Sequence, residues 1–114
     1  MTPRRGEIWM VEFDSAVGDE IRKIRPAIVL SLEEIGVLNV RIIVPLTDWK
    51  DRYGERTWMV HVVPSQVNGL QKESAVDCLQ CRSVSFERFK RRLGRLEADR
   101  LEEIAEAVGL CIGI

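Results

Sequence analysis

Residues 5–14 read RGEIWMVEFD, and the pattern of this stretch sets the expected fold class. Trp9, Val11 and Phe13 fall on one face of an extended chain, and the residues between them fall on the other. This period of two predicts a β-strand over residues 7–13. Short apolar runs elsewhere predict five more strands, over residues 27–31, 40–46, 58–63, 75–82 and 91–96.

A helical period appears only after these strands. Apolar residues recur there at helical spacing, namely Leu101, Ile104, Ala105 and Val108. Gly109 is predicted to end this helix. No helical segment separates the strands, which excludes parallel βαβ units. We therefore expect a mainly β fold with a C-terminal helix, in which an antiparallel sheet curls into a small barrel.

Length and composition are those of one globular domain over residues 1–114. The chain is 46% hydrophobic and 31% charged, which is typical of a globular protein in water. No apolar run approaches the ~20 residues of a membrane span. No apolar signal core follows the opening MTPRRGEIW, so we expect a cytoplasmic protein that does not contact a membrane.

Three cysteines raise the question of a metal site. Cys78 and Cys81 form a CxxC inside a predicted strand, where residues three apart point to opposite faces. No second CxxC or histidine pair accompanies them, because His61 is the only histidine. We therefore expect reduced thiols, no zinc site, and no metal or other cofactor.

The formal net charge of −1 argues against a protein that coats nucleic acid through bulk charge. The distribution is uneven, however. Six bases face a single acid between residues 82 and 95, and these bases are Arg82, Arg88, Lys90, Arg91, Arg92 and Arg95. On charge alone, this segment is either a solvated strand or a nucleic-acid face.

An arginine stands directly before a proline in residues 17–31, VGDEIRKIRPAIVLS. Pro26 biases Arg25 toward an extended backbone, and a buried strand follows. The guanidinium either points into a cleft, where its donors suit a phosphate, or forms a structural ion pair with an acid such as Glu20. Thr47 ends the next strand, so its hydroxyl is either a partner for Arg25 or an ordinary turn group.

The segment after Thr47 interleaves aromatic and basic residues, namely Trp49, Lys50, Arg52, Tyr53, Arg56 and Trp58. Such a combination suits stacking on unpaired nucleotides. Burial of the tryptophans in the core is the alternative. His61 is expected to be a half-exposed strand residue rather than a catalyst.

Four segments together resemble the MazF/PemK toxins, which are mRNA endoribonucleases. They are RGEIWMVEFD (5–14), VGDEIRKIRPAIVLS (17–31), VPLT (44–47) and SAVDCLQCRSV (74–84). The resemblance implies an SH3-like barrel of the PemK/CcdB type and a homodimer. It also implies sequence-specific cleavage of single-stranded RNA to 2′,3′-cyclic phosphate and 5′-hydroxyl ends, and inhibition by a cognate acidic antitoxin.

The resemblance also assigns roles to residues. It implies that Arg25, Thr47 and Glu20 are catalytic and that Gln80 and Arg82 bind RNA. Cyclising cleavage needs a base for the 2′-hydroxyl and charge stabilisation at phosphorus. Arg25 is too basic to be that base, which favours Glu20.

The aromatic and basic segment adds four expected RNA-binding residues, namely Lys50, Arg52, Arg56 and Trp58. The family's usual GSEQ is GDEI here, so Asp19 and Ile21 depart from it. The competing hypothesis is a CcdB-like toxin that binds a protein such as gyrase and cleaves nothing. Such a binder has no need to pair Arg25 with Thr47.

Overall fold

The computed structural model describes residues 2–114, and strands make up most of its regular structure. The strands are β1 (Glu7–Glu12), β2 (Ile24–Val29), β3 (Val40–Asp48), β4 (Met59–Val62), β5 (Ser74–Asp77), β6 (Arg82–Ser85) and β7 (Phe89–Arg95). The helices are α1 (Ala98–Cys111) and the short 3₁₀ turns η1 (Asp51–Glu55), η2 (Cys78–Gln80) and η3 (Phe86–Arg88).

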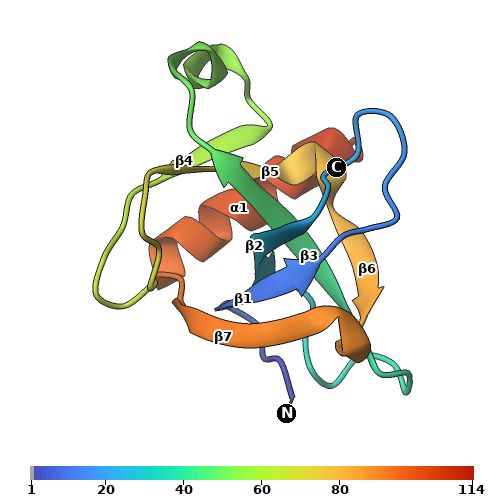
Figure 1. Cartoon of the computed structure of the whole chain (residues 1–114). Coiled ribbons are helices and arrows are strands. Elements are labelled where there is room, and N and C mark those ends of the chain that lie inside the picture. Colours follow the sequence, from blue (N-terminus) through green and yellow to red (C-terminus); the bar gives the residue numbers. More distant parts are fainter. Residues whose placement is uncertain (1) are drawn as a thin grey trace.

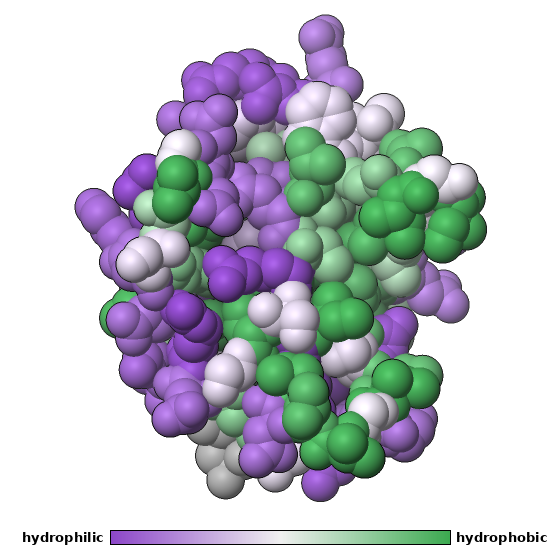
Figure 2. Space-filling view, turned by 90° about the vertical axis from the view of Figure 1, so that its right-hand side faces the viewer, coloured by the Kyte–Doolittle hydropathy of each residue, from purple (hydrophilic) through white to green (hydrophobic). Residues whose placement is uncertain are grey.

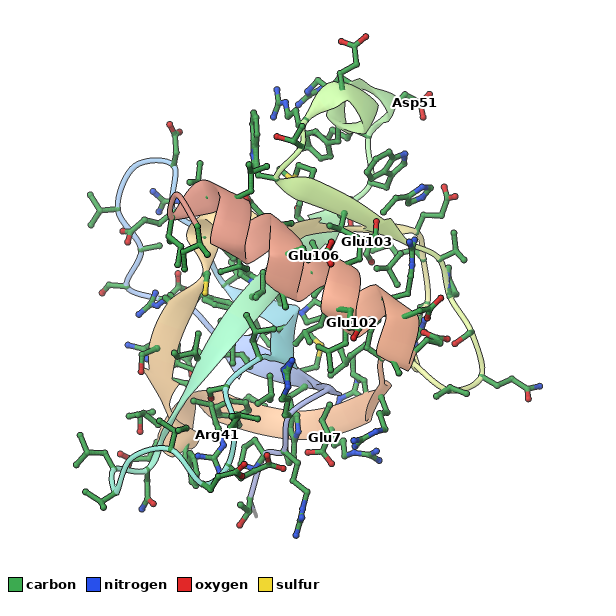
Figure 3. The ribbon with its side chains drawn as sticks, turned by 180° about the vertical axis from the view of Figure 1, so that it is seen from behind. Glu7, Arg41, Asp51, Glu102, Glu103 and Glu106 are labelled. Carbon is green, nitrogen blue, oxygen red and sulfur yellow. The ribbon has the colours of Figure 1, made fainter. Side chains whose placement is uncertain are left out.

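All strand pairs are antiparallel, in the order β4-β5-β3-β2-β1-β7, with β6 also paired to β3. The sheet is strongly curved, and α1 crosses it behind β3 in the view of Figure 1. Figure 3 shows the same helix from the other side, with Glu102, Glu103 and Glu106 along it. The expected mainly β barrel with a C-terminal helix is confirmed.

The core consists of two clusters on opposite faces of the sheet, and β1 contributes to both. Ile8 belongs to the cluster that packs under α1, which also contains Ile104. Trp9, Val11 and Phe13 belong to the other cluster. The predicted face of Trp9, Val11 and Phe13 is therefore buried, and Ile8 on the other face of β1 is buried as well.

β3 is the central strand of the fold. One of its edges pairs with β2, and the other pairs with β6 through residues 40–43 and with β5 through residues 46–48. Pro45 lies in the gap between these two ladders, so its missing N–H costs neither ladder a hydrogen bond.

Residues 75–82 are not one strand, so this prediction is wrong. The chain leaves β5 at Asp77, turns through η2, and re-enters the sheet as β6 against a different part of β3. The Asp77 carboxylate accepts a hydrogen bond from the Leu79 N–H at 3.2 Å, which stabilises this turn. Cys78 and Cys81 therefore do not point to opposite faces, and both pack against the cluster under α1.

The end of α1 also differs from the prediction. The helix continues through Gly109 to Cys111, and Gly113 has a φ of 84° just beyond the terminal residue. Gly113 therefore supplies the left-handed turn that commonly closes a helix, and the Ile114 N–H donates to the Gly109 carbonyl. No helix within residues 2–114 has the length and hydrophobicity that crossing a membrane requires.

Candidate active site

Arg25 and Thr47 lie on neighbouring strands at the same level. The β2–β3 ladder pairs Ala27 with Pro45, and continuing this register by two residues brings Arg25 opposite Thr47. Both residues are half-buried. Alternation along the two strands sends both side chains to the same face of the sheet. The strand register thus brings together the two residues that the sequence singles out.

The Arg25 guanidinium has no hydrogen-bonding or ion-pairing partner among residues 2–114. The structural ion pair with Glu20 does not form, because the Glu20 carboxylate accepts instead from the Val17 N–H at 2.6 Å. The donors of Arg25 are therefore available to an anionic ligand.

Asp48, next to Thr47, provides the nearby negative charge. Its pKa lies below the usual value, first because Lys72 donates to it at 2.9 Å and further because the positive charges of Arg25 and Lys50 are close. Asp48 thus stays ionised beside Arg25. Sequence reasoning missed Asp48 and Lys72, because Lys72 comes from a distant loop.

Arg25 and Thr47 line a cavity of about 350 Å³. Its floor is apolar and includes Pro26, Leu46 and Leu70, while its rim carries Lys72, Arg91 and Arg92. With Arg25, these bases outnumber the one acid of the lining, Asp48. The cavity can therefore hold a negatively charged group above an apolar surface.

The loop formed by residues 63–73 builds one wall of this cavity. Asn68 is fully buried and organises the loop, because its side-chain oxygen accepts from Ser65 and Leu70 N–H groups and its amide donates to the Val63 carbonyl. The loop lies directly on β7. A Cβ atom at Gly69 would lie 2.1 Å from the Leu93 carbonyl oxygen, and one at Gly94 would lie 2.4 Å from that of Val67.

Glu20, Gln80 and Arg82 lie in a second cavity, of about 420 Å³. Phe13 and Pro45 also line it, and Pro45 lies two residues before Thr47. Figure 1 shows the loops over residues 14–23 and 63–73 on opposite sides of the end of β3. The predicted site residues thus divide between two cavities, with Arg25 and Thr47 in the first and Glu20, Gln80 and Arg82 in the second.

Gln80 already bonds to protein groups through both parts of its amide. Its oxygen accepts from the Ile21 N–H at 2.6 Å, and its nitrogen donates to the Asp19 carbonyl at 3.0 Å and to Asp77 at 3.3 Å. Burial raises the pKa of the Asp77 carboxyl, and hydrogen bonds from Leu79 and Gln80 only partly offset this effect.

The aromatic and basic segment projects from the sheet around η1 at the top of Figure 1, and Figure 3 shows Asp51 at its tip. The Arg56 guanidinium lies 5.1 Å from the Tyr53 ring centroid and 5.8 Å from that of Trp58, and Arg52 lies 5.3 Å from that of Tyr53. Lys50 and Arg52 are exposed. None of the four residues predicted here to bind RNA lines either cavity.

The single histidine is half-exposed, as the sequence predicts. His61 stacks on Trp49 with ring centroids 3.9 Å apart and lines neither cavity. Trp49 is therefore partly covered by protein.

Half of the bases in the segment over residues 82–95 bond to residues of β1. Lys90 forms an ion pair with Glu12 at 3.1 Å, Arg92 pairs with Glu7 at 3.0 Å, and Arg88 donates to the Glu12 carbonyl. Arg91 and Arg92 reach the first cavity, and Arg82 reaches the second. Half of the six bases therefore reach a cavity, and the other half belong to a solvated strand.

The three thiols pack in or against the cluster under α1. Burial, followed by the proximity of Cys111, raises the pKa of Cys78 to about 12. Burial also raises the pKa values of Cys81 and Cys111. All three thiols are therefore protonated at neutral pH. Within residues 2–114, no group of three or more His, Cys, Asp and Glu side chains is placed to hold a metal ion.

Comparison with known proteins places the chain in a family. Residues 4–112 match the family model of the PemK-like, MazF-like toxins of type II toxin–antitoxin systems. The chain is 34% identical to endoribonuclease MazF9 of Mycobacterium tuberculosis H37Rv, over 94% of this chain and 93% of that protein.

Solved structures agree with this match. The crystal structure of MazF from Deinococcus radiodurans has a TM-score of 0.83 and 26% identity, over 100% of this chain and 99% of that one. A MazE–MazF crystal structure from the same organism matches with a TM-score of 0.72 and 26% identity, over 100% and 99% of the two chains. The chain therefore belongs to the PemK-like, MazF-like toxins of type II toxin–antitoxin systems.

Proposed function

We propose that this protein is the toxin of a type II toxin–antitoxin pair and acts as an mRNA interferase. It cleaves single-stranded RNA at specific sequences, without a metal ion, to a 2′,3′-cyclic phosphate and a 5′-hydroxyl. Residues 1–114 act as a single toxin domain in the cytoplasm. The family match and the endoribonuclease relative support this activity.

The observation that carries the cleavage chemistry is the unpaired Arg25 opposite Thr47. A phosphate in the first cavity, which Arg25 and Thr47 line, receives charge-assisted hydrogen bonds from the guanidinium and a further one from the hydroxyl. These donors stabilise the negative charge that builds up on the phosphorane as the 2′-oxygen attacks. As the P–O5′ bond breaks, the departing 5′-oxygen takes a proton from water and becomes the 5′-hydroxyl, so no proton transfer is required of Arg25.

Glu20 is the carboxylate proposed to take the 2′-hydroxyl proton. One of its oxygens accepts from the Val17 N–H, which leaves the other available as a base. The carboxylate approaches the phosphate from the side of the second cavity. The nucleotide that supplies the 2′-hydroxyl therefore lies on that side of Arg25.

The RNA path is proposed to pass Gln80 and Arg82 in the second cavity. It extends beyond the two cavities along Lys50, Arg52, Arg56 and Trp58. The Arg56–Trp58 contact provides a cation above a ring on which an unpaired base can stack. A paired duplex hides its bases, so the substrate is a single strand.

The partners are proposed by analogy with the relatives. A solved D. radiodurans structure contains MazE together with MazF. For this chain we propose a homodimer and a cognate acidic antitoxin that lies across the basic RNA path. The affinity between the toxin and the antitoxin is expected to fall as the salt concentration rises, because exposed charge pairs contribute to it.

The test is incubation of a long single-stranded RNA with the protein in EDTA. Discrete fragments are expected, with 5′-hydroxyl ends that a polynucleotide kinase labels without prior phosphatase treatment. Cleavage that appears only after Mg²⁺ is added would contradict the proposed chemistry. Intact RNA in both conditions, combined with inhibition of gyrase, would favour a CcdB-like binder.

A further inference from the structure

Gln80 connects η2 to the loop over residues 14–23, where it bonds to residues 59 and 61 positions away in sequence. Its side chain is partly buried between them. Both N–H bonds of the amide and one acceptor site of its oxygen are used by protein groups. Few hydrogen-bonding positions remain for a direct contact with RNA.

Gln80 bonds to the residues on either side of Glu20. The amide accepts from Ile21 and donates to Asp19, which are the two neighbours of Glu20. Fixing the peptide groups before and after a residue fixes the direction of its Cα–Cβ bond, from which the side chain projects. Asp77 accepts the second N–H of Gln80 and is itself buried, so the amide is held in one orientation.

The base of the same loop is closed without Gln80. The Phe13 N–H donates to the Lys23 carbonyl at 2.8 Å, the Lys23 N–H donates to Asp14 at 3.1 Å, and Arg88 donates to the Asp14 carbonyl at 2.6 Å. At the apex, the other bonds lie within the loop itself, between Val17 and Glu20 and from Arg22 to the Gly18 carbonyl. Contact with the rest of the described protein comes from Gln80 and from the packing of Ile21 against the Trp9 and Phe13 cluster. Loss of Gln80 should therefore release the apex and leave the loop base and the fold intact.

We propose that Gln80 is a positioning residue that clamps the apex of the 14–23 loop and so holds Glu20 at the reaction site. This proposal rests on the proposed function, in which Glu20 is the base. The clamp acts on kcat rather than on RNA binding, because it orients a catalytic group. A misplaced catalytic group commonly costs on the order of 10²-fold in rate.

The test compares Gln80→Leu with Gln66→Leu, the same change at an exposed glutamine that lines neither cavity. Thermal unfolding checks that both variants fold. Hydrogen exchange of residues 17–21 and the kinetics of cleavage of a short oligoribonucleotide are then measured. A second variant, Gln80→Glu, keeps an acceptor for Ile21 but removes the donor to Asp19.

We expect Gln80→Leu to speed exchange of the Ile21 amide and to lower kcat by 10-fold or more, on the order expected for a misplaced group. KM should change little, and Gln66→Leu should match the wild type. In a Glu20→Gln background, Gln80→Leu should cost little more, because the two residues act as one unit. Gln80→Glu should resemble Gln80→Leu.

Three results would overturn the proposal. The first is a rise in KM with unchanged exchange and kcat, which would indicate direct contact between Gln80 and RNA. The second is a full additive loss of kcat in the Glu20→Gln background. The third is a wild-type rate of amide exchange in both Gln80 variants. If the wild type cleaves no RNA, the proposed function fails and the catalytic role of the clamp fails with it. The exchange data then still decide whether Gln80 holds the loop.

Discussion

Arg25 occupies its position for reasons that are local to its strand. Pro26 restricts it to an extended backbone, and pairing with Val11 of β1 fixes that backbone in the sheet. Its guanidinium nevertheless has no partner among residues 2–114. A group that contributes no bond to the fold can be removed at little cost in stability.

The expected effect of Arg25→Ala is therefore on catalysis. The rate of RNA cleavage should fall on the order of 10²-fold or more, as it does when a donor to the transition state is lost. Thr47→Ala should cost less. The melting temperatures of both should remain near the wild-type value. Arg4→Ala, at an exposed arginine outside both cavities, is the matched control. An Arg25→Ala protein that unfolds while its soluble fraction still cleaves would show that Arg25 is structural.

Glu7 differs from Arg25, because its carboxylate forms several bonds within the folded protein. Burial would raise its pKa, but hydrogen bonds from Trp9 and the Arg4 N–H, together with the Arg92 charge, outweigh burial and lower it. The folded pKa lies below the unfolded one. The stabilisation is therefore complete above the unfolded pKa of about 4.3 and is lost as the pH falls through the folded pKa.

This linkage predicts the pH dependence of Glu7→Gln. The variant should be less stable than the wild type at pH 7, by about 1–3 kcal/mol for weakened bonds to a buried group. The difference should shrink as the pH is lowered below about 4.3. Chemical denaturation at a series of pH values measures it. A difference that is constant with pH would show that the charge of Glu7 contributes nothing.

At the scale of elements, the wall of the first cavity depends on a close approach of two backbones. The 63–73 loop lies on β7 at Gly69 and Gly94, where a Cβ atom would overlap carbonyl oxygens. Backbone atoms cannot move aside as a flexible side chain can. The two glycines therefore determine how far Leu70 and Lys72 stand from Arg25 across the cavity.

Gly94→Ala should push the loop off β7. We expect a loss of about 1–3 kcal/mol in the free energy of unfolding, as for other overpacked sites, together with weaker RNA cleavage. Gly109→Ala is the control, and it should change the free energy of unfolding in the opposite direction. Gly109 lies within α1 with ordinary contact distances, so alanine there should stabilise by up to about 1 kcal/mol. Wild-type stability and activity in Gly94→Ala would contradict the role given to this contact.

At the scale of the whole molecule, apolar side chains remain exposed in two areas. One is the end of α1, where Leu110, Ile112 and Ile114 are 56%, 67% and 94% exposed. The other is the β2–β3 connection, where Val37 is 97% exposed. Figure 2 shows hydrophobic surface on the face that carries both. Patches of this kind commonly mark protein interfaces.

We expect a homodimer that buries the end of α1. Light scattering at micromolar concentration should give the mass of two chains, and Ile112→Glu should shift it toward one, because a charge would be buried in an apolar interface. Val37→Glu makes the same change in the other area and should leave the dimer intact. A wild-type mass of one chain would contradict the dimer, and dissociation by Val37→Glu alone would move the interface to the β2–β3 connection.

Sequence by itself determined the local features of this protein. The alternation in residues 7–13, the apolar runs and the final helical period predict the strands and α1, because burial of one face imposes its period on the chain. Arg25 could be singled out because its proline neighbour acts through covalent geometry. The resemblance to MazF/PemK toxins added Gln80 and Arg82 as expected site residues and gave Glu20 and Thr47 their expected catalytic roles.

Tertiary structure decided what depends on contacts between distant segments. Residues 75–82 read as one apolar run, yet β5 and β6 divide it, because β3 offers two separate edges on either side of Pro45. Lys72 and Asp48 meet because β5 pairs with the end of β3, which places Ser74 opposite Asp48 and Lys72 close by. Gln80 bonds to Asp19 and Ile21 across some sixty residues, and no local pattern records such a bond. Local periodicity reports which side of a segment is buried, whereas pairing and loop contacts depend on where the other segments lie.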